Sequence, residues 1–149
     1  MVSFADVLTE ASPTQLERAT VLLAYEGAAV SAAECALAAG RVYDKLHAHL
    51  SPLLGSAGVR ALLVRSAKLT ERRFSFFEGA IVESSTKLRE CLQAQDAAVA
   101  TESAAVLFGT FFALITTFIG DRLTTEALRR AWPTIDEIAP SGTTGETEK

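Results

Sequence analysis

The chain contains a long stretch without a single charged residue, from Ser103 to Gly120. Glu102 precedes this stretch, and Asp121 and Arg122 follow it. A helix that is apolar on all sides is either buried in a protein core or surrounded by lipid. The segment therefore indicates the central helix of a small bundle or, as an alternative, a short membrane span.

The length and the flanks of the segment favour the bundle. A hydrocarbon core takes about twenty consecutive apolar residues to cross, and this segment is shorter and includes three threonines. Aromatic residues do not bracket it, because Trp132 lies well beyond its end, and the arginines follow on one side only. We predict a buried helix over about residues 97–119, capped by Asp96 and ended by Gly120. Insertion of residues 103–120 into lipid is the alternative.

Length and composition fit one globular domain. With 149 residues, of which 49% are hydrophobic, the chain can bury a core without disulfides or metals. The formal net charge of −4 argues against a nucleic-acid partner, because phosphate binding needs a basic surface. The first residues lack the features of a secretory signal, which predicts a cytoplasmic protein. We expect one domain over residues 1–138, followed by a disordered polar tail over residues 139–149.

Helical periodicity and breaker residues divide the chain into helices, and no segment sustains the alternation of a strand. Pro13 is typical of a first helical position, Gly40 of a stop or kink, and Pro52 of a break. The expected helices cover residues 2–11, 13–40, 41–50, 59–73, 81–95, 97–119 and 121–132, with a loop at 55–58. The sequence thus predicts an all-α fold, a single compact bundle of five to seven helices around the central apolar helix.

Small residues recur at four-residue spacing in the first half of the chain, for example at Ala28, Ala32 and Ala36. Such a stripe lets another helix approach closely. The apolar helix has a thin side of its own, with Gly109 and Ala113. We expect these two thin surfaces to pack against each other.

Residues suited to catalysis or metal binding are scarce. His47 and His49 are the only histidines, and residues two positions apart point about 200° apart on a helix, so they cannot share a metal ion. Cys35 and Cys91 lack the spacing of a metal or redox motif, and we expect buried reduced thiols. Phosphate-binding loops, nucleophile elbows and zinc-protease motifs are also absent. We predict no catalytic residue, no metal site and no cofactor.

Two carboxylates, Glu26 and Glu34, fall in the small-residue helix predicted over residues 13–40. One interpretation is a buried acidic site that binds a cation or titrates. The alternative, which we favour, is that both emerge at the edge of the helix and pair with basic residues. The candidate partners are Arg41, Lys45 and Arg122.

Positive charge concentrates in residues 59–73. Arg65, Lys68 and Arg72 are spaced to line one side of a helix, which suits an acidic partner, an anionic headgroup or nucleic acid. A solvated helix face is the alternative. Near the end of the chain, Arg130 lies close to Trp132, a combination that is typical of an interface hot spot but also of a residue closing a core.

These observations favour a non-enzymatic interaction or regulatory module that acts through protein–protein contacts. We expect a protein partner or self-association as a homodimer, with Arg65, Lys68, Arg72, Arg130 and Trp132 as the candidate partner-binding residues. Two alternatives remain: a membrane-associated protein that buries residues 103–120 in lipid, and a bundle that binds an apolar ligand or cofactor near residues 74–77 and 108–118.

Overall fold

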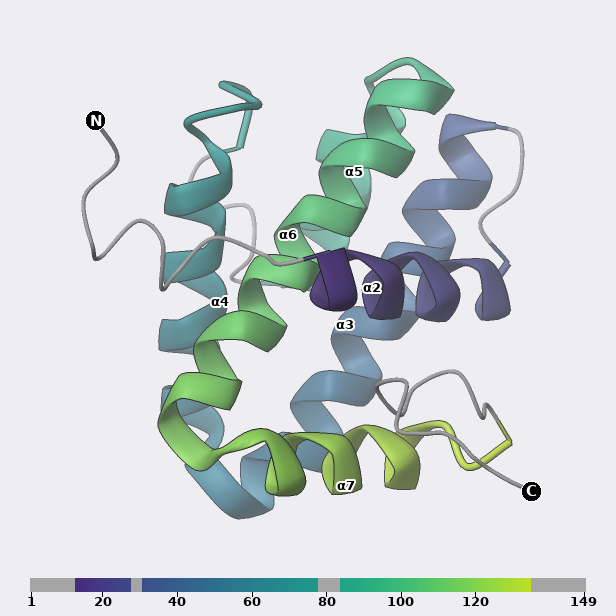
Figure 1. Cartoon of the computed structure of the whole chain (residues 1–149). Coiled ribbons are helices and arrows are strands. Elements are labelled where there is room, and N and C mark those ends of the chain that lie inside the picture. The colour runs from purple at the N-terminus through teal and green to yellow at the C-terminus, as the bar shows by residue number, and fades with distance from the viewer. Residues whose placement is uncertain (1–12, 28–30, 78–83, 135–149) are drawn as a thin grey trace.

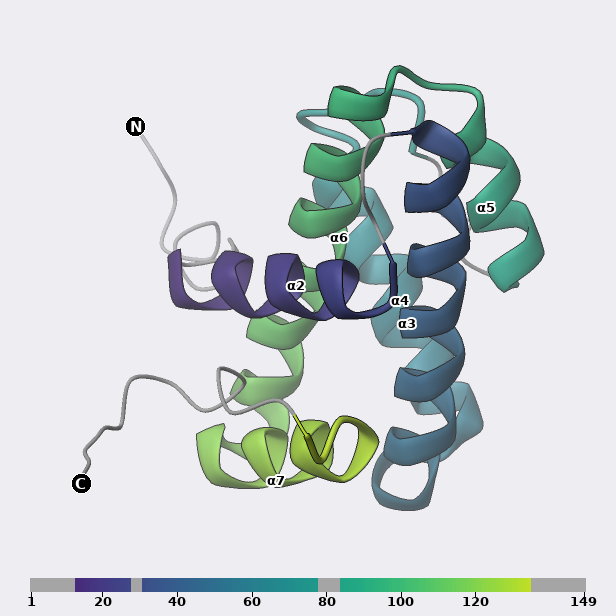
Figure 2. The ribbon, with the colours of Figure 1, turned by 90° about the vertical axis from the view of Figure 1, so that its right-hand side faces the viewer.

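The computed structural model describes residues 13–27, 31–77 and 84–134, and this part of the chain contains six α-helices and no strand. Helices α3 to α6 run roughly along one axis, and α2 and α7 lie across them (Figure 1 and Figure 2). The all-α bundle predicted from the sequence is confirmed. The helices are α2 (Pro13–Tyr25), α3 (Ala32–Leu54), α4 (Ser56–Thr70), α5 (Ser85–Gln93), α6 (Ala97–Ile119) and α7 (Asp121–Ala131).

Two helices, α6 and α3, share the centre of the bundle. The backbone of each lies close to all the other described helices, whereas the backbones of α2, α4, α5 and α7 lie close only to these two. Because neighbours surround α6, every side chain from Ser103 to Phe112 is buried. The central apolar helix is therefore confirmed, with the predicted bounds, and α3 joins it at the centre.

Among the described helices, α6 is the one that is long and apolar enough to cross a membrane. Within its candidate window, 72% of the residues are buried inside the protein. The core helix of a soluble protein has the same length and composition. The neighbouring helices bury most of α6, as they would bury the core helix of a bundle.

Both ends of α6 fall where the sequence places them. Gly120 follows its last residue with φ +90°, a conformation that side chains with a Cβ rarely adopt, and the chain turns there into α7. Asp96 occupies the N-cap position, but its side chain makes no capping hydrogen bond. The glycine, rather than the aspartate, is thus the local signal that defines this helix.

The helix predicted over residues 13–40 is wrong, because two helices meet there at a turn. Gly27, just after α2, has φ +114°. The side chain of Ser31 then accepts a hydrogen bond from the Glu34 amide at 3.0 Å, and Glu34 Oε1 accepts one from the Ser31 amide at 3.3 Å. This capping box starts α3. The run of small residues around it concealed the signal.

Helix α3 continues through both of its predicted ends, Gly40 and Pro52. Pro52 lies in the last turn, so the helix loses the hydrogen bond to the Ala48 carbonyl only two residues before it ends. The hydroxyl of Ser51, the residue before Pro52, donates to the carbonyl oxygen of His47, one turn earlier in the helix, at 2.6 Å. The expected loop is reduced to Gly55, whose φ of +81° turns the chain directly into α4.

The small residues of α3 pack mainly against α5, and the predicted pairing with α6 is the lesser of the two contacts. A Cβ at Gly40 would lie 2.7 Å from Cδ of Arg89 on α5, so the glycine allows the two helices to approach closely. On the other side of the contact, Leu88 and Leu92 are fully buried. The expected helix over residues 2–11, residues 81–83 and the boundary at residue 138 lie outside the described residues.

Candidate protein interface

The basic ridge, which we define as Arg65, Lys68 and Arg72, begins on the outer side of α4 with Arg65 and Lys68 and ends at Arg72, in the turn just after the helix. Val59 and Leu63 are completely buried on the opposite side of the helix, toward α3 and α6. All three basic side chains are exposed. Helix α4 forms one edge of the molecule in Figure 1, so the ridge faces away from the bundle.

The charges of Arg65 and Lys68 are not neutralised by any residue that the structure describes. Neither side chain has a hydrogen-bond or ion-pair partner among these residues. Like charges three or four positions apart on a helix destabilise it by about 0.2–0.5 kcal/mol per pair. The spacing between Arg65 and Lys68, both within α4, is of this kind. Folding alone therefore gives no reason for this arrangement.

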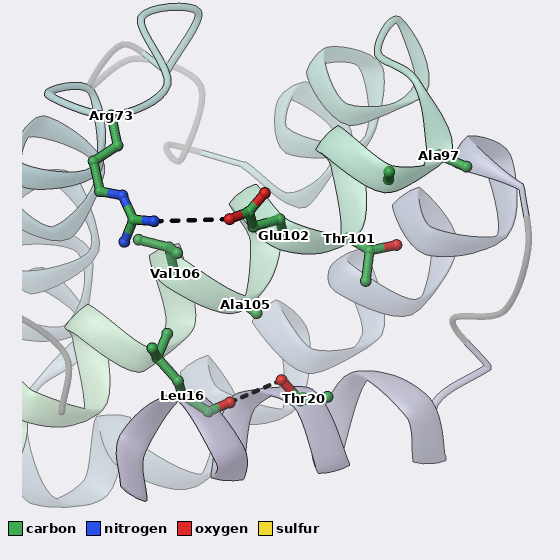
Figure 3. A pocket seen from close by; sticks show the side chains of 9 residues that line it. Leu16, Thr20, Arg73, Ala97, Thr101, Glu102, Ala105 and Val106 are labelled. Atoms are coloured by element: carbon green, nitrogen blue, oxygen red, sulfur yellow. Dashed lines mark hydrogen bonds and ion pairs between the residues drawn. The ribbon is translucent and has the colours of Figure 1, made fainter. Parts of the chain in front are cut away.

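A groove of about 560 Å³ lies between α2 and the end of α4, over the first half of α6 (Figure 3). At its edge, Arg73 Nη2 and Glu102 Oε2 form an ion pair at 3.7 Å, although both side chains are more than half exposed. The remaining lining is mostly small and apolar: Leu16, Thr20, Ala97, Ala98, Thr101, Ala105 and Val106.

The groove is not at the place where the sequence suggests a ligand cavity. Phe108, Phe111 and Phe112 are completely buried and fill the core, and neither they nor Phe74 and Phe77 line the groove. The bulky aromatic residues thus pack inside the bundle. Small side chains of α6 leave the open space at the surface.

The two remaining candidate partner-binding residues lie at the end of α7, away from the ridge, since α4 and α7 do not contact each other. Arg130 is exposed. Trp132 is completely buried, and its indole Nε1 donates to Glu26 Oε2 at 2.7 Å. The position of Trp132 agrees with the alternative interpretation, a residue that closes the core.

Glu26 connects the ends of α2 and α7 to the middle of α3. Its carboxylate, 8% exposed, forms an ion pair with Lys45, whose ammonium lies 5.5 Å from the Trp132 ring centre and 5.7 Å from that of Tyr25. The Glu26 carbonyl accepts a hydrogen bond from Arg41 at 2.7 Å. The predicted pairing of Glu26 with Lys45 is confirmed, whereas Glu34 belongs to the capping box at the start of α3.

Arg18 was missed by the sequence analysis. Its guanidinium, 2% exposed, donates to Thr125 Oγ1 at 2.8 Å and lies 3.9 Å from the Asp121 carboxylate. Burial lowers the pKa of Arg18, and the negative charge of Asp121 partly opposes this shift. The sequence did hold a signal, because Arg18 is one turn from Leu22 on the apolar side of α2.

The described residues contain no group of three or more histidine, cysteine and acidic side chains that could hold a metal ion. His47 Nε2 lies 3.1 Å from Ser56 Oγ, a contact that links α3 to the first turn of α4. Cys35 is buried and Cys91 half-buried, and neither forms a disulfide bond among the described residues. What the surface offers is therefore binding chemistry: exposed cations beside an apolar groove.

Comparison with known proteins gives this surface no precedent. The chain matches no protein-family model, no curated protein and no solved structure.

Proposed function

We propose that the protein is a helical interaction module that binds an acidic protein segment through the basic ridge of α4. The observation that carries this proposal is the row of exposed cations Arg65, Lys68 and Arg72, in which Arg65 and Lys68 have no ion-pair partner among the described residues. An acidic partner would relieve the repulsion between these charges and gain attraction to each of them.

The rest of the molecule supports binding by this surface in particular. The protein as a whole carries a formal net charge of −4, so an acidic partner is repelled elsewhere and attracted here. The same net charge disfavours a long polyanion such as RNA, which would extend beyond the ridge. Because the ridge is exposed, its attraction should weaken with salt.

The test compares two variants that lose the same charge. Arg65→Gln/Lys68→Gln/Arg72→Gln removes the ridge, and Arg122→Gln/Arg129→Gln/Arg130→Gln removes three exposed arginines of α7. Fluorescence anisotropy measures the binding of a labelled glutamate-rich peptide at low and physiological salt. We expect the ridge variant to lose about tenfold or more in affinity and the α7 variant to stay near wild type.

Equal losses in the two variants would mean that only net charge matters, which contradicts the proposal. Tighter binding to a single-stranded RNA than to the peptide would contradict it as well. Light scattering coupled to size-exclusion chromatography of the same proteins tests whether the partner is a second copy of this chain. If wild type and the α7 variant are dimers and the ridge variant is a monomer, the acidic segment belongs to this chain.

A further inference from the structure

We infer that the acidic segment is an amphipathic helix whose apolar side enters the groove between α2 and α4 while its carboxylates face the basic ridge. This inference rests on the proposed function and specifies the class of partner. It assigns a role to the groove, which the proposed binding of an acidic segment by the ridge does not explain.

The ridge ends beside the groove, because Arg72 directly precedes Arg73, which lines the groove. Leu62 and Leu69 lie next to the ridge on α4. Both leucines are half-buried, so part of each is available to a ligand. A partner that lies across this side of α4 therefore meets cations first and apolar surface next.

The groove is large enough to take side chains of a partner, and its lining lets a helix backbone approach. Its volume of about 560 Å³ falls within the range of pockets that bind ligands, about 300–1,000 Å³. Ala97, Ala98 and Ala105 have short side chains, which let the backbone of a second helix approach closely. Apolar side chains one turn apart on that helix would then enter the groove together.

The ion pair at the edge of the groove adds charge complementarity. Arg73 and Glu102 are 57% and 62% exposed, and exposed pairs of this kind contribute little to stability. A carboxylate of the partner can therefore replace Glu102 on the Arg73 guanidinium at small cost (Figure 3). Arg73 would extend the row of cations from the ridge to the groove.

The experiment selects ligands without assuming a sequence. A library of displayed random peptides, about 15 residues long, is sorted on the wild-type protein. We expect the enriched peptides to combine acidic residues with apolar residues at positions i, i+3 or i+4, and i+7. The best peptide is then measured against single variants of the groove.

Ala98→Glu places a carboxylate at an exposed position that lines the groove, and Thr20→Glu does the same from α2. Ala48→Glu, at an exposed position in the middle of α3, is the matched control. We expect about tenfold weaker binding in both groove variants and unchanged binding in the control. Circular dichroism establishes that each variant is folded. If one groove variant does not fold, the other still tests the groove.

The outcomes separate the two proposals. Acidic peptides without apolar periodicity, bound equally by wild type and Ala98→Glu, would overturn the inference and leave the proposed function intact. Enriched peptides without acidic residues, or no enrichment at all, would overturn both. Stronger binding to phosphatidylserine vesicles than to the selected peptides would assign the surface to lipid instead.

Discussion

Helix α6 and the α2–α7 junction both hold the bundle together, but through different interactions. We define the junction by three contacts: Arg18 with Thr125, Glu26 with Trp132, and Tyr25 with Thr134. Around α6, apolar side chains of five helices fill the space. At the junction, α2 and α7 make no close backbone contact, and long polar side chains bridge the distance.

The difference teaches which part of a fold depends on composition and which on particular pairs. Apolar burial is not directional, so many side chains of similar volume satisfy it. A hydrogen bond or ion pair needs a specific partner at a specific distance. We therefore expect substitutions in α6 to act through lost volume, and substitutions at the junction through lost partners.

The largest expected effect lies in α6. Phe111 is completely buried, and Phe111→Ala should lower the free energy of unfolding by about 3–5 kcal/mol, through lost apolar burial and the cavity left behind. Urea denaturation followed by circular dichroism measures the loss. Phe118→Ala, at a position 68% exposed, is the control and should change stability little. Equal losses would show that the end of α6 is covered by a partner or by lipid.

A smaller effect is expected at the junction. Trp132→Phe keeps an aromatic ring but removes the N–H that donates to the Glu26 carboxylate, which should cost about 1–3 kcal/mol. Tyr25→Phe removes a hydroxyl whose contact with Thr134 is exposed, and should cost less than about 0.5 kcal/mol. Guanidinium denaturation followed by circular dichroism compares the two. If Tyr25→Phe cost as much as Trp132→Phe, burial would not govern these contacts.

The thiol of Cys35, where α3 contacts α6, makes the stability of this part of the core depend on pH. Burial raises the pKa of Cys35, and a hydrogen bond with Thr101 of α6 opposes this shift. The unfolded chain therefore loses this proton first, above about pH 8.5. Stability should fall as pH rises from there toward the folded pKa, by at most about 1.4 kcal/mol per pH unit.

Denaturation of wild type and Cys35→Ala at several pH values between about 8 and 10 isolates this contribution. The variant should show a shallower decline than the wild type. Parallel declines would mean that Cys35 ionises alike in both states.

The smallest effect concerns two helical glycines. Gly58→Ala meets only an ordinary contact, Cβ of Leu54 at 3.6 Å, and should stabilise α4 by up to about 1 kcal/mol. Gly40→Ala forces the Arg89 side chain to move, which should cancel that gain. Thermal unfolding by calorimetry should therefore rank Gly58→Ala above Gly40→Ala. The reverse order would show that α3 and α5 have room between them.

The sequence predicted the parts of the fold that depend on composition. The uncharged stretch predicted that α6 is the central helix, and Gly120 predicted its C-terminal end, because a helix apolar on all sides has few other places to lie. The spacing of Arg65 and Lys68 likewise predicted exposed cations on the outer side of α4. Periodicity and charge are local properties, and a sequence displays them directly.

The parts that depend on distant pairs were not predictable in the same way. Trp132 and Glu26 are 106 positions apart, and no sequence pattern near either residue indicates that the two are in contact. The groove results from the crossing of α2 over the alanines of α6, a relation between helices that no single segment encodes. By contrast, Ser31 and Glu34 were a readable capping signal, which the small residues around them obscured.

The shared centre of the bundle has a consequence for biosynthesis. Helix α6 follows α2 to α5 along the chain, yet every one of those helices packs against it. A ribosome adds about 5–20 residues per second, so for several seconds the emerging helices lack the surface that they are to cover. Chaperones that bind exposed apolar segments should therefore hold the nascent chain until α6 has left the exit tunnel, and release it soon afterwards.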